Sequence, residues 1–278
     1  MPISVQLVVL LAALLHASWN AIVKSSQDKF LDIVFVTASA AALSAVVVPF
    51  LPLPDSASWG YIAASVGIHV FYFVLIGAAY QSGDMGHAYP LMRGAPPLIV
   101  ALASGPLIGE QLSLSAWVGV LLVCAGILGL LLAKSASLSR GRTTRLALLN
   151  AGSVAAYTLV DGTGVRLSGN PAAYTMWMFF LTAFPILAWA GWRRKAAVLG
   201  HLRVRWYLML AGGACTLGSY TLVLWAMTHA PIAMVAALRE TAIAFGIAIS
   251  MFVLREPGGI HRLCAVLVIL LGAMSLKF

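Results

Sequence analysis

The 278-residue chain contains 62% hydrophobic but only 9% charged residues, whereas soluble domains carry about 25% charged residues. A chain of this composition cannot cover itself with a polar surface, which excludes a soluble enzyme and predicts a membrane protein. Most of the net charge of +9 falls in predicted loops, so no nucleic-acid partner is expected. The three cysteines have no metal-type spacing, and neither a metal nor a cofactor is expected.

Apolar runs of about 20 residues are long enough to cross the hydrocarbon core of a bilayer. The sequence contains ten such runs joined by short connections, which predicts an all-α polytopic membrane protein without a soluble domain. No basic stretch precedes the first run, so the first helix is expected to remain as an anchor. The expected helices lie near residues 4–23, 30–50, 59–80, 87–108, 113–133, 145–165, 171–192, 206–228, 231–253 and 260–277.

The basic residues are distributed unevenly between the two sets of loops. Of the 17 Lys and Arg residues, 13 lie in or beside loops that follow odd-numbered helices. Cytoplasmic loops of membrane proteins are enriched in Lys and Arg. The charge pattern therefore predicts cytoplasmic odd-numbered loops and both termini outside, and we expect a multi-pass protein of the bacterial inner membrane.

The two halves of the chain are related by an internal repeat. A shift of 146 residues aligns 61–132 with 207–278 without a gap. Because each half contains five helices, an odd number, the second must cross the membrane in the opposite direction. We expect one repeat in 1–133, a basic linker at 134–145 and an inverted repeat in 146–278. The identical pairs include Tyr61 and Tyr207, Arg93 and Arg239, Ser104 and Ser250, Glu110 and Glu256, and Gly126 and Gly272.

On the first helix, His16, Trp19 and Asn20 share a face, because residues three and four apart are neighbours on a helix surface. A shift of 138 residues aligns Tyr157 of the sixth helix with Trp19, and Asp161 follows one turn later. These side chains are candidates to line a central cavity. An interhelical hydrogen bond or a packing contact is the alternative for each of them.

The third helix carries His69 and Tyr72 within its apolar run. Hydrogen bonding or ring stacking would allow either side chain to contact a ligand in the same cavity. The same alternative of a packing role applies to both.

Arg93 and Arg239 lie within the fourth and ninth helices, near the middle of the membrane. An Arg near the bilayer centre costs at least ~2.5–3.5 kcal/mol and usually faces a cavity lined by water or protein. A long side chain can instead reach the membrane interface. The repetition of the arginine at equivalent positions of the two halves favours the cavity. Because the planar guanidinium group suits carboxylate and phosphate oxygens, the pair predicts a site for an anionic or zwitterionic metabolite.

The acidic residues of the predicted helices have different roles. Glu240 follows Arg239 directly and aligns with Gly94, so it has no acidic counterpart. A structural ion pair is favoured for Glu240, and proton coupling is the alternative. Its asymmetry makes it the candidate for coupling transport to an ion gradient. Glu110 and Glu256 come just after their helices and are expected to cap or orient the next helix.

Several segments resemble the drug/metabolite transporter superfamily, in its EamA-like branch. They are His16-Ala-Ser-Trp-Asn20, Tyr80-Gln-Ser-Gly-Asp84, Tyr89-Pro-Leu-Met-Arg93-Gly94 and the helix ends at Glu110 and Glu256. The resemblance extends over both halves and implies ten helices around a central cavity that contains Tyr89, Arg93 and Arg239. The same segments resemble a branch associated with phosphonate utilisation, which would suit two intramembrane arginines.

These observations together favour a secondary transporter of a small amino acid, carboxylate or phosphonate, working by alternating access as a monomer or homodimer. A coupling proton or a counter-substrate is the expected further partner, within a lipid bilayer. Export of neutral or hydrophobic compounds, or lipid flipping, is the alternative on the same fold. An enzyme is not expected, because the sequence contains no paired catalytic carboxylates, no HExxH and no phosphate-binding Gly loop.

Overall fold

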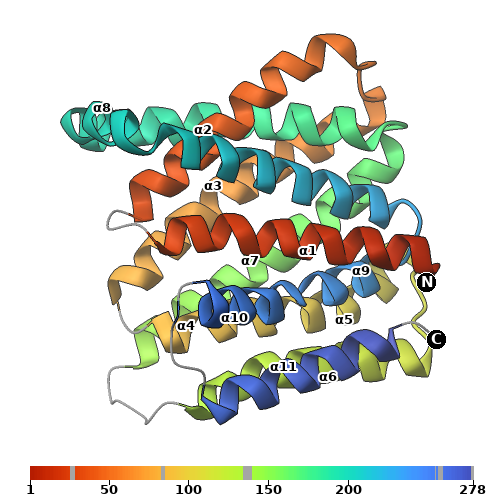
Figure 1. Cartoon of the computed structure of the whole chain (residues 1–278). Coiled ribbons are helices and arrows are strands. Elements are labelled where there is room, and N and C mark those ends of the chain that lie inside the picture. The colour runs from red at the N-terminus through yellow and green to blue at the C-terminus, as the bar shows by residue number, and fades with distance from the viewer. Residues whose placement is uncertain (26–28, 83–84, 134–139, 254, 256–258, 277–278) are drawn as a thin grey trace.

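The computed structural model describes residues 1–25, 29–82, 85–133, 140–253, 255 and 259–276. Every regular element within these ranges is helical, and Figure 1 shows the helices stacked side by side as a bundle. The elements are α1 (Ile3–Lys24), α2 (Lys29–Val47), η1 (Val48–Phe50), η2 (Ser56–Ser58), α3 (Trp59–Ser82), α4 (Met85–Gly94), α5 (Pro96–Ile108), α6 (Leu114–Gly129), η3 (Leu130–Ala133), α7 (Arg140–Leu167), α8 (Pro171–Met227), α9 (Ile232–Arg239), α10 (Ala242–Phe252) and α11 (Ile260–Ser275).

These elements make up the ten predicted membrane crossings. The shorter apolar helices α6 and α11 and the 28-residue α7 provide three of them. The other seven are long and apolar enough by themselves, and they are Ile3–Lys24, Leu31–Phe50, Ser56–Ile76, His87–Ile108, Pro171–Ala188, Arg205–Met227 and Ile232–Phe252. The chain is therefore an all-α polytopic membrane protein.

Two predicted boundaries differ from the structure. Residues 193–205, expected to connect two helices, are helical, so α8 is continuous over 57 residues. Figure 1 shows α8 running out to one end of the bundle and returning, and its two parts cross separately. In addition, α7 begins at Arg140, inside the segment 134–145 expected to be a linker. In both places helical backbone continues past the apolar run, because helix formation does not require apolar side chains.

The packing of α6 against α11 shows how the two halves are related. A Cβ atom on Gly119 would lie 2.9 Å from the carbonyl oxygen of Gly272, and one on Gly126 would lie 3.0 Å from that of Ala265. Under the 146-residue shift, Gly119 is equivalent to Ala265 and Gly126 to Gly272. Equivalent helices therefore run antiparallel and exchange equivalent contacts, as a two-fold axis in the membrane plane requires. The repeats are inverted.

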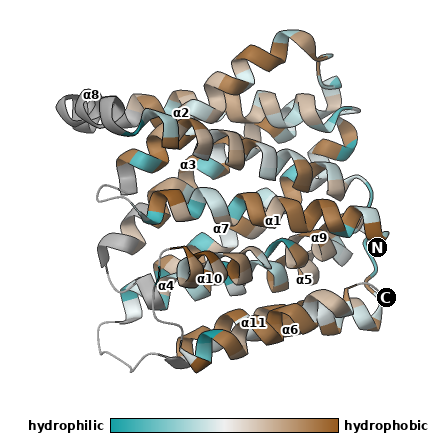
Figure 2. Cartoon of the chain, viewed as in Figure 1, coloured by the Kyte–Doolittle hydropathy of each residue, from teal (hydrophilic) through white to brown (hydrophobic). Residues whose placement is uncertain are grey.

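Figure 2 shows that the helices are largely hydrophobic, and many large apolar side chains are exposed, as expected for a surface that faces lipid. Leu7, Leu102, Leu107 and Leu121 are among the exposed large side chains. Polar and charged side chains are instead buried between the helices. The N- and C-termini lie at the same end of the bundle, as an even number of crossings requires (Figure 1).

Gly126→Ala should lower the free energy of unfolding by about 1–3 kcal/mol, because the added methyl group overpacks the contact between α6 and α11. The methyl carbon would lie 2.9 Å from Cγ1 of Ile269 and 3.0 Å from a backbone oxygen. Gly129→Ala is the matched control on the same helix, where no atom lies within 4 Å. It should be neutral or stabilise by up to ~1 kcal/mol, because alanine favours helix. Thermal unfolding in detergent measures both, and equal effects would contradict the close approach of the helices.

Candidate functional site

The fourth and ninth crossings are each interrupted in the middle, at equivalent positions. The break between α4 and α5 falls at Ala95, and the break between α9 and α10 falls at Glu240 and Thr241. The 146-residue shift aligns Ala95 with Thr241. In lipid, irregular backbone is tolerated only where protein or a water-filled cavity surrounds it. The two breaks therefore mark a polar region inside the bundle.

The two breaks have different local causes. In the first half, Pro96 and Pro97 lack backbone N–H groups, so the helical hydrogen bonds that these two residues would donate are missing, although Ala95 itself keeps helical dihedral angles. At the break of the second half no proline is present, and the backbone instead tightens into turns with hydrogen bonds between residues three apart. There the Glu240 nitrogen donates to the Ala237 oxygen (3.1 Å), and the Thr241 nitrogen donates to the Leu238 oxygen (3.1 Å).

Arg93 and Arg239 lie at the ends of α4 and α9, directly before these breaks, and both contact Glu240. Arg93 Nε is 3.0 Å from Glu240 Oε2, and Arg239 Nη2 is 3.7 Å from Oε1. All three side chains are buried, with exposed fractions of 12% for Arg93, 5% for Arg239 and 1% for Glu240. A carboxylate of the second half thus lies between one guanidinium group from each half. With two cations and one anion, the cluster carries a net charge of +1.

Several polar atoms of this cluster have no hydrogen-bond partner among the described residues. They are Nε and Nη2 of Arg93, Nε of Arg239 and Oε2 of Glu240. The 3.0 Å contact between Arg93 and Glu240 is therefore close but not aligned as a hydrogen bond. Buried donors and acceptors are normally satisfied, and leaving one unpaired costs about 1–3 kcal/mol. Donors and one acceptor are consequently available for a ligand or for water.

Two of the three candidate residues on the first helix lie near this cluster, and the third is hydrogen-bonded to its own helix. The charges of Arg93 and Arg239 act on the His16 ring. Trp19 Nε1 donates to His16 Nδ1 (3.3 Å), and the two rings meet edge to face. The Asn20 amide instead donates to the His16 carbonyl oxygen of its own helix (2.7 Å). His16 and Trp19 therefore form one unit near the arginines, while the Asn20 amide is engaged by its own backbone.

The other candidate side chains form an aromatic cluster next to the arginines. His69 stacks on Tyr157 with ring centroids 4.4 Å apart, and Tyr72 meets Tyr157 edge to face at 6.1 Å. Tyr72, Tyr89 and Tyr157 all interact electrostatically with Arg93. The structure thus brings together side chains of α1, α3, α4, α7 and α9, from both halves.

Sequence reasoning missed two tyrosines that belong to the same region. Tyr174 and Tyr220 both donate their hydroxyl groups to the fully buried carboxylate of Asp161, the first at 2.9 Å. Tyr220 also contacts Tyr157, with ring centroids 6.4 Å apart. Tyr220 lies well inside an apolar run rather than at a helix end, and this position is the signal that could have identified it. Tyr174 lies in the first turn of α8, where a tyrosine is ordinary, so nothing in the sequence marks it.

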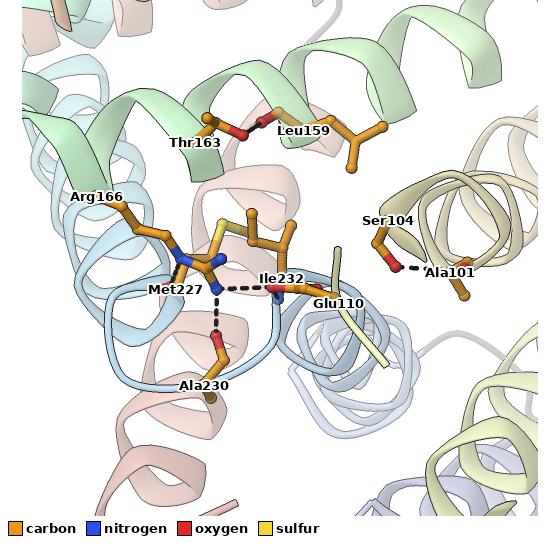
Figure 3. A network of polar contacts seen from close by, with 9 residues as sticks. All are labelled: Ala101, Ser104, Glu110, Leu159, Thr163, Arg166, Met227, Ala230 and Ile232. Atoms are coloured by element: carbon orange, nitrogen blue, oxygen red, sulfur yellow. Dashed lines mark hydrogen bonds and ion pairs between the residues drawn. The ribbon is translucent and has the colours of Figure 1, made fainter. Parts of the chain in front are cut away.

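A second polar network joins the two halves at the end of the bundle that holds the termini (Figure 3). Glu110, just after α5, accepts hydrogen bonds from Arg166 Nη2 (2.7 Å) and from the backbone nitrogen of Ile232 (2.9 Å). Arg166 also donates to the carbonyl oxygens of Met227 (2.8 Å) and Ala230 (2.9 Å). Glu110 therefore caps a helix, but the helix is α9 of the other half, which corrects the expectation that it caps or orients the next helix.

The equivalent serines of the repeat have different partners, and Ser104 turns back to its own helix. Ser104 donates to the Ala101 carbonyl oxygen at 3.2 Å, as Figure 3 shows. Ser250 instead accepts a hydrogen bond from Lys24 Nζ at 2.8 Å, which joins α1 to α10 at the opposite end of the bundle. Glu256, the counterpart of Glu110, lies outside the described residues.

Double substitution at Arg93 and Glu240 should show strong energetic coupling, because each single change leaves a buried charge without its closest partner. Glu240→Gln and Arg93→Gln should each cost about 3–5 kcal/mol of stability. The double variant should lose clearly less than the sum, as measured by thermal unfolding in detergent. Arg145→Gln is the control, since Arg145 is exposed and donates to the Gly141 oxygen of its own helix. Additive losses would contradict the buried ion pair.

Comparisons with known proteins agree with this architecture. Residues 3–132 and 144–277 each match the model of the EamA-like transporter family. A solved structure titled only "Crystal structure of protein" has a similar fold, with a TM-score of 0.79 and 18% identity. That match covers 99% of this chain and 96% of the other. No curated protein matches the sequence significantly.

Proposed function

Because this chain belongs to the EamA-like transporter family, we propose that it is a secondary transporter that moves a small anionic or zwitterionic metabolite by alternating access. The cluster of two arginines and one glutamate at the interrupted helices is the observation that carries this proposal. Inverted repeats with interrupted helices around a midplane site are typical of secondary transporters.

The charges of the cluster support a zwitterionic substrate best. Arg93 and Arg239 offer buried N–H donors without hydrogen-bond partners, which suit a carboxylate or phosphonate group. Oε2 of Glu240 pairs with Arg93 but accepts no hydrogen bond, and it suits an ammonium group. A molecule with both groups, such as an amino acid or an aminophosphonate, would satisfy both ends of the cluster. A net charge of +1 also accommodates a simple monoanion.

The half-helices add to this preference for a negative group. The N-termini of α5 and α10 lie at the breaks, directly after the segments that carry Arg93 and Arg239. The N-terminus of a helix carries a partial positive charge and favours anions. The aromatic rings of His69, Tyr72 and Tyr157 form the neighbouring surface. They would suit an apolar portion of the substrate, and they are the feature that favours the alternative of a hydrophobic cargo.

Contacts between the halves at both ends of the bundle support alternating access. Glu110 of the first half holds Arg166 and α9 of the second half at the end with the termini. Lys24 of the first half holds Ser250 of the second half at the opposite end. Opening one end requires breaking its contacts while the other end stays closed. By the loop charges, the Glu110 contact would close the outer side.

Thermal stability in detergent tests the substrate class. Glycine, acetate, methylphosphonate and 2-aminoethylphosphonate serve as charged probes, and thymine and tetraphenylphosphonium serve as neutral and hydrophobic ones. A probe at 100 times its Kd should stabilise the folded protein by about 2.7 kcal/mol. Stabilisation by an anion or zwitterion should disappear in Arg93→Lys and Arg239→Lys, because lysine cannot reproduce the planar donor pair.

Arg145→Lys is the matched control and should keep the ligand response, since Arg145 is exposed and outside the cluster. Stabilisation by thymine or tetraphenylphosphonium alone would contradict the proposal. It would make the arginines structural and favour export of neutral or hydrophobic compounds.

Loss of the Glu110 contact should favour opening at the outer end. Spin labels at the exposed Leu107 and Leu167 report the separation of the two halves there. Glu110→Gln and Arg166→Gln should each populate longer distances between the labels, because a charged hydrogen bond between the halves is removed. Ser113→Ala is the control at the same end, where Ser113 caps its own helix α6. An unchanged distance distribution in both charge variants would contradict the role of this contact.

A further inference from the structure

Asp161 on α7 is a buried carboxyl group that the arginine cluster does not use. Its side chain is fully buried, and its two oxygens accept the hydroxyl groups of Tyr174 and Tyr220 on α8. No ion pair with a basic side chain is recorded for Asp161 within the described part of the chain. Its equivalent under the 138-residue shift is Val23, so the acid belongs to the second half alone.

The groups that face Asp161 come from several helices. On α3, His69 acts on it electrostatically, and the Ser65 hydroxyl lies 3.1 Å from His69 Nδ1. On α8, Tyr174 and Tyr220 hold the carboxylate directly. On α9, Arg239 acts on Tyr220 rather than pairing with Asp161. The basic side chain that acts on Asp161 is therefore a histidine rather than an arginine or a lysine.

This environment can accommodate Asp161 with or without a proton. When the acid is ionised, both tyrosine hydroxyl groups donate to it, as observed. When it is protonated, it can donate to a tyrosine oxygen, because a phenol is both a donor and an acceptor. Burial disfavours a carboxylate that has no counter-charge, so the protonated form is not penalised by its surroundings.

Glu240 does not share this property. It lies between Arg93 and Arg239, so a proton on Glu240 would leave two buried cations without an anion. The geometry thus moves the coupling role expected for Glu240 to a different carboxyl group.

Asp161 is also connected to the arginine cluster through aromatic side chains. Tyr220, which holds Asp161, contacts Tyr157 and His69, with ring centroids 6.4 and 6.1 Å apart respectively. Tyr157 interacts electrostatically with Arg93, and Tyr220 with Arg239. The α3–α7 contact beside Asp161 also joins the first half to the second. A change of charge at Asp161 can therefore act on both the substrate cluster and the interface between the halves.

We propose that Asp161 is a proton-binding site that couples transport to the proton gradient, an inference that rests on the proposed transporter function. Asp161 takes up one proton from water on one side of the membrane and releases it to water on the other. On uptake, an O–H bond of a hydronium ion breaks as the O–H bond of the acid forms, and on release the reverse occurs at the other side. Tyr174, Tyr220 and His69 position the carboxyl group and exchange hydrogen bonds with it.

Infrared difference spectroscopy on protein reconstituted in lipid tests the proton site without any substrate. Acidification should produce the carbonyl stretching band of a protonated carboxyl group in the unmodified protein. The band should be absent in Asp161→Asn and retained in Glu240→Gln. In Tyr220→Phe it should appear at higher pH, because the ionised acid loses a hydrogen-bond donor. The latter variant keeps the acid and tests the proposal even where Asp161→Asn does not fold. A band that is unchanged in Asp161→Asn, or lost only in Glu240→Gln, would overturn the assignment.

Flux measurements separate this proposal from the substrate class. In proteoliposomes with 2-aminoethylphosphonate or glycine, a proton gradient should drive uptake several-fold above the level without a gradient. Asp161→Asn should lose this stimulation but keep exchange of labelled for unlabelled probe. Exchange without any response to the gradient in the unmodified protein would overturn the coupling role and leave the transporter function intact. Absence of exchange by both probes, with the infrared band present, would contradict the substrate class instead.

Discussion

The contact between Arg93 and Glu240 joins the two halves of the protein in the interior of the membrane. A buried charge is tolerated only when it is paired, and removal of either partner leaves the other exposed to a medium of low dielectric constant. The pair can form only if the two interrupted helices approach each other at their breaks. The burial of Arg239 and the position of the donors that have no hydrogen-bond partner both depend on this approach. Because the carboxylate serves two guanidinium groups, the region keeps an excess of positive charge.

The rest of the bundle holds the halves together without closing this region. Apolar side chains gain little by leaving lipid for protein, so helices in a membrane associate through close packing and hydrogen bonds. Gly119 and Gly126 allow α6 and α11 to touch at their backbones. Glu110 and Lys24 make polar contacts between the halves at opposite ends of the bundle. Rigid packing on one flank and breakable polar contacts at the ends suit two bodies that rock about a fixed centre.

The ten crossings and the inverted repeat could be predicted from the sequence, because apolar runs and internal identity are local properties of the chain. The paired arginines could be found for the same reason. The pairing of Glu240 with Arg93 could not be predicted, since periodicity identifies residues that share one helix but not the helix that lies opposite. The role of Glu110 at α9 and the tyrosines around Asp161 depend on tertiary contacts in the same way. The continuous α8 was missed because its basic segment is polar but still helical.

The features that the two halves share differ in kind from those they do not share. The arginines, the helix breaks and the packing glycines occur in both halves, and a two-fold axis places them evenly about the centre. Two buried acids of the second half, Glu240 and Asp161, have no acidic counterpart in the first half, where Gly94 and Val23 occupy the equivalent positions. A fully symmetric site would present like charges to both ends of a ligand and could not distinguish them. Placing an acid on one side creates a direction within the site, as a substrate with unlike ends requires. In the transport cycle that we propose, the symmetric parts would provide the motion, while the asymmetric acids would provide recognition and coupling.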